Sequence, residues 1–157
     1  MVQRALVSGL LAAGCEVVEL GIVTTPGTAL MVGRLKAAGG VVVTASHNPK
    51  QWNGIKFLTP QGYAPPPDEA QRILDRYRNK QFSLAPVDKL RSATADDSTH
   101  DQHIGAVSAQ VGVDAIRKRS FHVVLDSVNG AGGTGGRMLL ERLGCRVTHL
   151  NAEPTGH

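Results

Sequence analysis

VVVTASHNP, residues 41–49, joins a short apolar run to a polar loop, and this junction decides how the rest of the sequence is interpreted. Continuous valine runs are typical of strands buried in parallel sheets. Ligand sites in such sheets gather where the strands end, so chemistry is expected in the loop. Asn48 is kept out of helical geometry by Pro49, whose ring also fixes the direction of the chain. We therefore expect a rigid loop that presents Ser46 and His47 together.

A second strand, Ile55–Leu58, is expected directly after the turn signal Asn53-Gly54. Side chains alternate along a strand, so Lys56 lies on the face opposite to its two apolar neighbours. If this strand pairs with the valine strand, Lys56 can reach the Ser46 loop, where a cation would stabilise a phosphate and the charge moved in its transfer. A serine, a histidine and a lysine around one anion supply a carrier and candidate proton donors or acceptors. The alternative is that Ser46, His47 and Asn48 only cap a turn, as such residues often do.

Strands and helices alternate on both sides of this loop, which predicts an α/β protein with mixed, largely parallel sheets and flanking helices. Residues 83–103 are rich in Ser, Thr, Asp and Ala without apolar periodicity, and we interpret them as a linker. The linker separates parts of two similar α/β domains, residues 1–82 and residues 104–157. Helices are expected at 2–13, 28–38, 68–79, the later part of 104–118 and 137–143, strands at 15–20, 41–44, 55–58, 123–126 and 145–150, and a glycine-rich loop at 129–136.

Composition limits the classes of function that the chain can have. Its 157 residues are 41% hydrophobic and carry a net charge of +4, as in an ordinary globular protein. The basic residues are spread out apart from Arg117-Lys118-Arg119, a cluster typical of a solvated helix end, so no nucleic-acid partner is expected. No apolar run is long enough to span a membrane, and no membrane partner is expected. Cys15 and Cys145 form no metal-ligand pattern and predict reduced, mostly buried thiols in a cytoplasmic protein.

The stretch 41–49, followed by Asn53-Gly54-Ile55-Lys56-Phe57, resembles the active-site signature of the α-D-phosphohexomutase superfamily. That superfamily contains phosphoglucomutases, phosphomannomutases and phosphoglucosamine mutases, which are isomerases that act as intramolecular phosphotransferases. Residues 21–26 (GIVTTP) resemble the loop before the second helix of the family's first domain. Residues 124–126 (VLD) with 129–132 (NGAG) resemble the opening of its second domain. The resemblance therefore covers most of the chain.

The resemblance implies a phosphoserine mechanism. The serine that Ser46 matches is phosphorylated in the active enzymes, gives its phosphoryl group to a hexose phosphate to form a bisphosphate, and takes the other phosphate back. His47 and Lys56 match catalytic positions beside that phosphate, with acid–base or electrostatic roles, and Asn48 matches a loop residue that contacts it. The implied cofactors are Mg²⁺, held in part through the phosphate of Ser46, and an activating hexose bisphosphate. Phosphoglucosamine or phosphomannose is the expected substrate.

Several motifs of the family do not occur in the sequence. They are the metal loop Asp-x-Asp-x-Asp-Arg, the sugar-recognition loop, the phosphate-binding loop and the Gly-Thr-Asp-Gly opening. Phosphoryl transfer without the metal-ligating aspartates lacks its main charge neutraliser. We therefore expect an internal piece of a mutase, which carries the serine, is not active alone and has the remaining parts of the mutase as its partner.

Two alternatives remain at this stage. Residues 130–135 (GAGGTG) fit G-x-G-x-x-G after a predicted strand, and Glu153 lies where a ribose-binding acid would be, which would indicate a dinucleotide-binding module. However, residues 127–129 separate the strand from the first glycine, where that fingerprint expects a glycine almost at once. The other alternative is a truncated, non-catalytic remnant that binds a phosphosugar or a partner through exposed strand edges and apolar faces.

Overall fold

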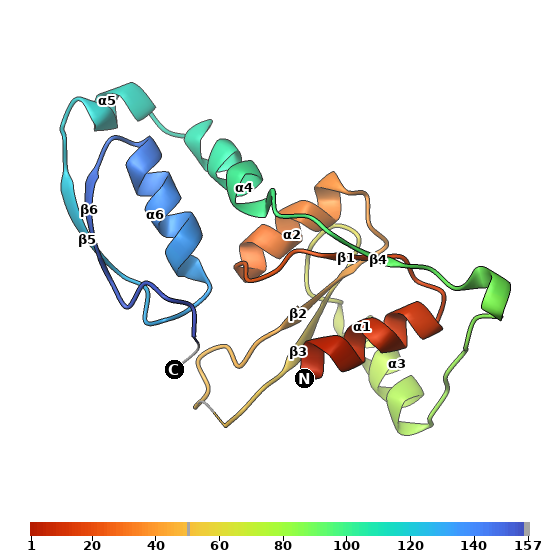
Figure 1. Cartoon of the computed structure of the whole chain (residues 1–157). Coiled ribbons are helices and arrows are strands. Elements are labelled where there is room, and N and C mark those ends of the chain that lie inside the picture. The colour runs from red at the N-terminus through yellow and green to blue at the C-terminus, as the bar shows by residue number, and fades with distance from the viewer. Residues whose placement is uncertain (50, 156–157) are drawn as a thin grey trace.

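Two α/β units follow each other along the chain in the computed structural model, which describes residues 1–49 and 51–155 (Figure 1). The prediction of an α/β protein with mixed, largely parallel pairing and flanking helices is confirmed. The predicted second region, 104–157, reaches two residues beyond the described part, and the division of the chain into domains stays a prediction. The elements are α1 (Val2–Ala12), β1 (Val17–Glu19), α2 (Thr25–Arg34), β2 (Gly40–Val43), β3 (Ile55–Leu58), α3 (Pro67–Arg78), a 3-10 turn (Val87–Lys89), β4 (Ala93–Ala95), α4 (Thr99–Ser108), α5 (Val113–Arg117), β5 (His122–Asp126), α6 (Gly132–Arg142) and β6 (Arg146–Leu150).

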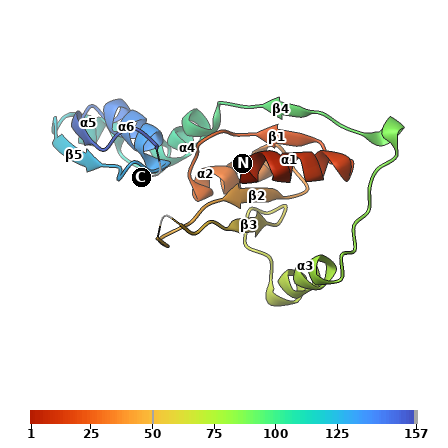
Figure 2. The ribbon, with the colours of Figure 1, turned by 60° about the horizontal axis from the view of Figure 1, so that its bottom comes forward.

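The first unit contains two strand pairs. β1 pairs in parallel with β4, and β2 pairs with β3 as an antiparallel hairpin. Figure 2 shows β4, β1, β2 and β3 one below another, with α3 apart from them. Residues 83–103, expected as a linker, therefore contain regular structure, because β4 returns to β1 and α4 begins before residue 103.

Helix α2 covers β2 and carries part of the core. It begins earlier than the predicted start at Thr28 because the Thr24 hydroxyl accepts the Gly27 N–H at 3.2 Å and a proline occupies the first turn. The buried hydrophobic side chains of the described residues lie on α2, β2, α4 and at the end of α6. They are Met31, Val32, Val42, Ile104 and Leu143.

In the second unit, β5 and β6 form a parallel pair on which α6 packs. Helix α6 begins inside the predicted glycine-rich loop 129–136, so that loop prediction is wrong from Gly132 onward. The physical reason is close packing. A Cβ on Gly133 would lie 2.9 Å from the Ser127 hydroxyl, and one on Gly136 would lie 3.4 Å from Leu125. The glycines therefore let the helix lie close against β5.

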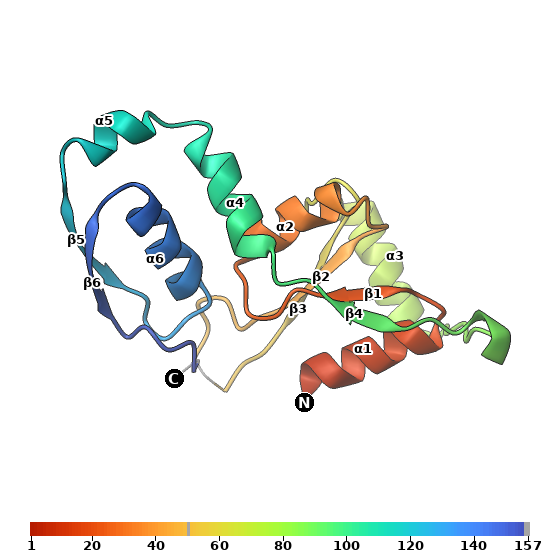
Figure 3. The ribbon, with the colours of Figure 1, turned by 45° about the horizontal axis from the view of Figure 1, so that its top comes forward.

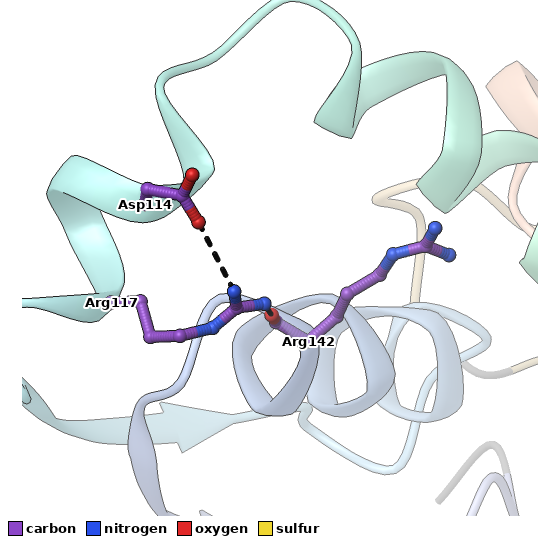
Figure 4. Close-up of polar contacts among 3 residues, drawn as sticks. All are labelled: Asp114, Arg117 and Arg142. Atoms are coloured by element: carbon purple, nitrogen blue, oxygen red, sulfur yellow. Dashed lines mark hydrogen bonds and ion pairs between the residues drawn. The ribbon is translucent and has the colours of Figure 1, made fainter.

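Helix α5 is tied to the end of α6 by one arginine (Figure 4). The Arg117 guanidinium donates to the Arg142 carbonyl oxygen at 3.0 Å and lies 3.2 Å from the Asp114 carboxylate. A cation at the last carbonyls of a helix is favourable because those carbonyls lack partners within the helix. The basic cluster at 117–119 thus contributes a helix cap.

Helix α4 lies between the two units and packs on both α2 and α6 (Figure 1). Thr99, which is 1% exposed, and His100 lie at its first turn. A Cβ on Gly27 of α2 would come within 3.0 Å of the Thr99 methyl group, and one on Gly135 of α6 within 2.8 Å of His100 Nδ1. The connection between the units is therefore a closely packed helix.

Two further expectations can be compared with the structure. Cys15 is exposed and Cys145 is half-buried, and both are free thiols, so the prediction of mostly buried cysteines is wrong for Cys15. No helix in the described part of the chain is long and apolar enough to cross a membrane.

Candidate active site

The loop that connects β2 to β3 lies at the tip of the hairpin, at the carboxyl end of β2. In Figures 1 and 3 this tip points to the side of the molecule on which β5 and β6 also end. The expectation that the Ser46 loop follows a strand is confirmed. Among the described residues that strand pairs antiparallel with β3, and not in parallel as its valine run indicated.

Pairing between the two hairpin strands fixes both ends of the loop. Val42 lies opposite Lys56, so the expected pairing of the two strands is confirmed. The ladder continues past the strands, because the Thr44 N–H donates to the Gly54 carbonyl at 2.9 Å. The Gly54 N–H donates in turn to the Asn53 side chain at 2.9 Å. The turn signal in the sequence therefore closes the returning half of the loop.

Ser46 has an unusual backbone conformation. Its φ angle is +56°, in the left-handed region, and its N–H donates to Thr44 Oγ1 at 3.0 Å. A left-handed conformation costs a residue with a Cβ about 1–2 kcal/mol, and residues held in this way are concentrated at functional sites. The next turn is closed by the Asn48 N–H, which donates to the Ala45 carbonyl at 3.1 Å. The loop is thus held by its own hydrogen bonds.

Ser46 and His47 lie together at the exposed tip. Ser46 Oγ is 3.3 Å from His47 Nδ1, so a proton can pass between the hydroxyl and the ring, in a direction set by the tautomer. Lys56 is exposed on β3, on the same face as Val42. Among the described residues, the side chains of Lys56 and Asn48 make no hydrogen bond, and both are free to meet an anion.

Thr44 is a residue of the site whose role the sequence interpretation missed. Its hydroxyl accepts the Ser46 N–H and so helps to set the direction of the serine. The signal was present, because Ser and Thr side chains often bond the backbone N–H two residues further on.

The described residues do not supply a complete metal site. They contain no group of three or more His, Cys, Asp or Glu side chains that could hold a metal ion. A phosphate on Ser46 would be the one metal ligand from this loop, whereas Mg²⁺ prefers six oxygen ligands. The residues present therefore do not fit a Mg²⁺ site by themselves.

The glycine-rich segment after β5 does not have the geometry of a dinucleotide loop. Its residues Val128 and Asn129 have φ angles of +44° and +54°, and they separate the strand from the first glycine. Gly133 and Gly135 face Ser127 and His100, so their lack of a side chain serves internal packing. The geometry disfavours the dinucleotide alternative.

Polar groups join the ends of β5 and β6. The Asn151 side-chain amide and the Val128 N–H each donate to the Asp126 carboxylate at 2.9 Å. These two hydrogen bonds, that from Asn151 most strongly, hold the pKa of Asp126 below its ordinary value. Ser127 Oγ and His149 Nε2 lie 2.5 Å apart under the first turn of α6. These bonds fix the edge of the second unit that lies on the same side as the Ser46 loop.

Comparison with known proteins places the chain in a family. Residues 1–84 match the family described as phosphoglucomutase/phosphomannomutase, alpha/beta/alpha domain I. The chain belongs to the phosphoglucomutase/phosphomannomutase family. The resemblance seen in the motif is therefore confirmed.

Relatives extend the similarity over the whole chain. A phosphoglucomutase/phosphomannomutase of Thermococcus kodakarensis is 38% identical over 157 residues, all of this chain and 34% of the relative. A relative from Methanosarcina barkeri, named "Probable phosphoglucosamine mutase", is 38% identical over 157 residues, which are 35% of its length. A crystal structure of a phosphoglucomutase/phosphomannomutase family protein from Burkholderia thailandensis superimposes with a TM-score of 0.77 at 28% identity, covering 99% of this chain and 33% of that one. The chain thus spans about a third of the length of the relatives it matches.

Proposed function

We propose that this chain carries the phosphoryl-accepting serine of a phosphohexomutase. The observation that supports this most directly is the exposed Ser46 with its φ of +56° and its hydroxyl 3.3 Å from His47, at the tip of a hairpin in a member of the phosphoglucomutase/phosphomannomutase family. The activity is phosphoryl transfer between the 1- and 6-hydroxyls of a hexose phosphate. Phosphoglucosamine is favoured by the names of several relatives, whereas the name of another gives phosphoglucose and phosphomannose equally.

The proposed chemistry runs through a phosphoserine. The bond between phosphorus and Ser46 Oγ breaks while a sugar hydroxyl oxygen forms a bond to the same phosphorus, which gives a hexose bisphosphate. The proton of the sugar hydroxyl is taken up by a base of the site, and the departing Oγ receives a proton. In the second half, Oγ gives its proton to a base of the site and attacks the phosphorus of the other phosphate. The bond between that phosphorus and the sugar oxygen breaks, and the sugar oxygen takes up a proton, which restores the phosphoserine and releases the isomeric hexose phosphate.

The neighbours of Ser46 have defined tasks in this scheme. His47 Nδ1 is within reach of Oγ and can hand a proton to it or take one from it. Lys56, on the strand paired with β2, would stabilise the negative charge of the moving phosphoryl group, and Asn48 would donate to its oxygens. Because the described residues do not fit a Mg²⁺ site by themselves, no step of this scheme is assigned to a metal ion.

A chimera tests the proposal. Residues 1–157 replace the matching third of the Thermococcus kodakarensis relative, and the interconversion of hexose 1- and 6-phosphates is measured. We expect activity in the chimera and a loss of at least about 10³-fold in Ser46→Ala, because the covalent carrier is removed. The matched control is Ser120→Ala, since Ser120 is also an exposed serine with a left-handed backbone, φ +48°, and should be neutral.

The outcomes separate the hypotheses. If Ser46→Ala keeps the turnover of the parent chimera, Ser46 is not the carrier. If the chimera folds but interconverts no hexose phosphate while the intact relative does, a non-catalytic remnant becomes the better description of this chain.

A further inference from the structure

Thr44 makes two hydrogen bonds at the point where β2 enters the loop. Its N–H donates to the Gly54 carbonyl at 2.9 Å, and its own carbonyl oxygen lies 3.2 Å from where a Cβ on Gly54 would stand. Its hydroxyl accepts the Ser46 N–H at 3.0 Å. Thr44 is half-buried, whereas Ser46 is exposed. A residue anchored to the paired strand through its N–H therefore holds the serine through its hydroxyl.

The left-handed backbone of Ser46 needs such a restraint. Residues with a Cβ avoid positive φ unless the surroundings impose it. Among the described residues, the Thr44 hydroxyl is the one side-chain group that bonds the Ser46 backbone. The turn closed by the Asn48 N–H and the Ala45 carbonyl constrains the segment around Ser46 without bonding Ser46 itself.

We propose that Thr44 is a positioning residue for Ser46. Its hydroxyl fixes the serine in the left-handed conformation in which Oγ lies beside His47 Nδ1 at the exposed tip of the hairpin. The role of Ser46 as phosphoryl carrier rests on the proposed function, whereas the restraint by Thr44 is a property of the loop and is measured without any substrate.

The test is an NMR comparison of variants of this 157-residue chain. A left-handed residue has its N–H close to its own Hα, so Ser46 should show a strong intraresidue cross-peak between these protons. Thr44→Val keeps the shape of the side chain but removes the acceptor, and we expect the cross-peak to weaken about fivefold as φ returns to negative values. Thr44→Ser keeps the hydroxyl and should restore the strong cross-peak.

Two internal references come from the same molecule. Ser120, with φ +48°, should keep a strong cross-peak in every variant. Thr59, just after β3, has a buried hydroxyl without a hydrogen-bond partner among the described residues. Thr59→Val therefore removes a hydroxyl from the same hairpin and should leave the Ser46 cross-peak unchanged. Retention of the strong Ser46 cross-peak in a folded Thr44→Val overturns the inference.

The unmodified chain provides a second measurement in case Thr44→Val does not fold. The Ser46 N–H, bonded to Thr44 Oγ1, should exchange with solvent deuterium about fivefold more slowly than the neighbouring His47 N–H after correction for intrinsic rates. Equal exchange at the two positions contradicts the inference. Neither readout depends on phosphoryl transfer, so an inactive chimera would count against the proposed function and leave the assignment of Thr44 to be decided by NMR.

Discussion

Gly62 lies at the far end of the Ser46 hairpin, where its backbone comes close to helix α2. Gly62→Ala should therefore lower the free energy of unfolding. Gly62 closes the turn after β3, donating its N–H to the Thr59 carbonyl at 2.8 Å, and its φ is +81°. A Cβ at this position would lie 2.7 Å from the Ala29 carbonyl oxygen and 3.2 Å from its carbon. These are backbone atoms of α2, so they cannot rotate away.

The expected cost has two parts. Alanine at positive φ loses about 1 kcal/mol relative to glycine, and forcing an extra carbon into a packed backbone contact costs about 1–3 kcal/mol. The free energy of unfolding should therefore fall by about 2–4 kcal/mol, which corresponds to a lower Tm by about 5–15 °C for a chain of this length.

Two matched substitutions separate these parts. Gly21 has φ +72° and open space where a Cβ would stand, so Gly21→Ala should cost only about 1 kcal/mol. Gly33 lies inside α2, also with open space, and Gly33→Ala should stabilise the helix by about 0.5–1 kcal/mol. Urea and thermal unfolding followed by circular dichroism give the three values. Equal costs for Gly62→Ala and Gly21→Ala would refute the predicted contact between the hairpin and α2.

The remaining predictions concern the site and its surroundings. In the chimera, Lys56→Gln should lower kcat about 10²–10³-fold, because the charge of the moving phosphoryl group is no longer stabilised. Lys118→Gln, at the exposed end of α5, is the control and should leave kcat unchanged in the same steady-state assay. Thr44→Val should lower kcat about tenfold with KM unchanged, and Thr44→Ser should recover most of it; a change confined to KM would contradict the positioning role. Because hydrogen bonds from Asn151 and Val128 lower the folded-state pKa of Asp126, the stability they provide is complete above the ordinary Asp value near 3.8 and is lost as the pH falls through the lower folded value. Asn151→Ala should therefore raise the pKa of the Asp126 carboxyl in an NMR titration, and an unchanged titration would contradict this assignment.

The hairpin that carries Ser46 was predictable because its signals are local. An apolar run, a turn signal and an alternating strand follow each other within residues 41–58, and the structure pairs them in the expected way. The contact between Ser46 and His47 follows from their adjacency. By contrast, the left-handed conformation of Ser46 was not predicted. Periodicity does not reveal the bond from its N–H to the Thr44 hydroxyl, and only the local bonding tendency of threonine indicates it.

Strand β4 and the start of α6 were missed for different physical reasons. Strand β4 is Ala-Thr-Ala, and its three residues are exposed. It forms because β1, far away in the sequence, offers a parallel edge. A pairing of that kind leaves no apolar pattern in the segment itself. The start of α6 was missed because glycines are poor helix formers, and here close packing against β5 and α4 outweighs that intrinsic cost.

The close contacts at the first turn of α4 limit how the two units can move relative to each other. Thr99 against Gly27 and His100 against Gly135 leave no room for an extra carbon at these two points, so the first turn of α4 resists sliding along either neighbouring helix. Any change in the angle between the two units must therefore turn about α4 or push on α2. Because α2 rests on β2, such a push would act on the strand that leads into the Ser46 loop.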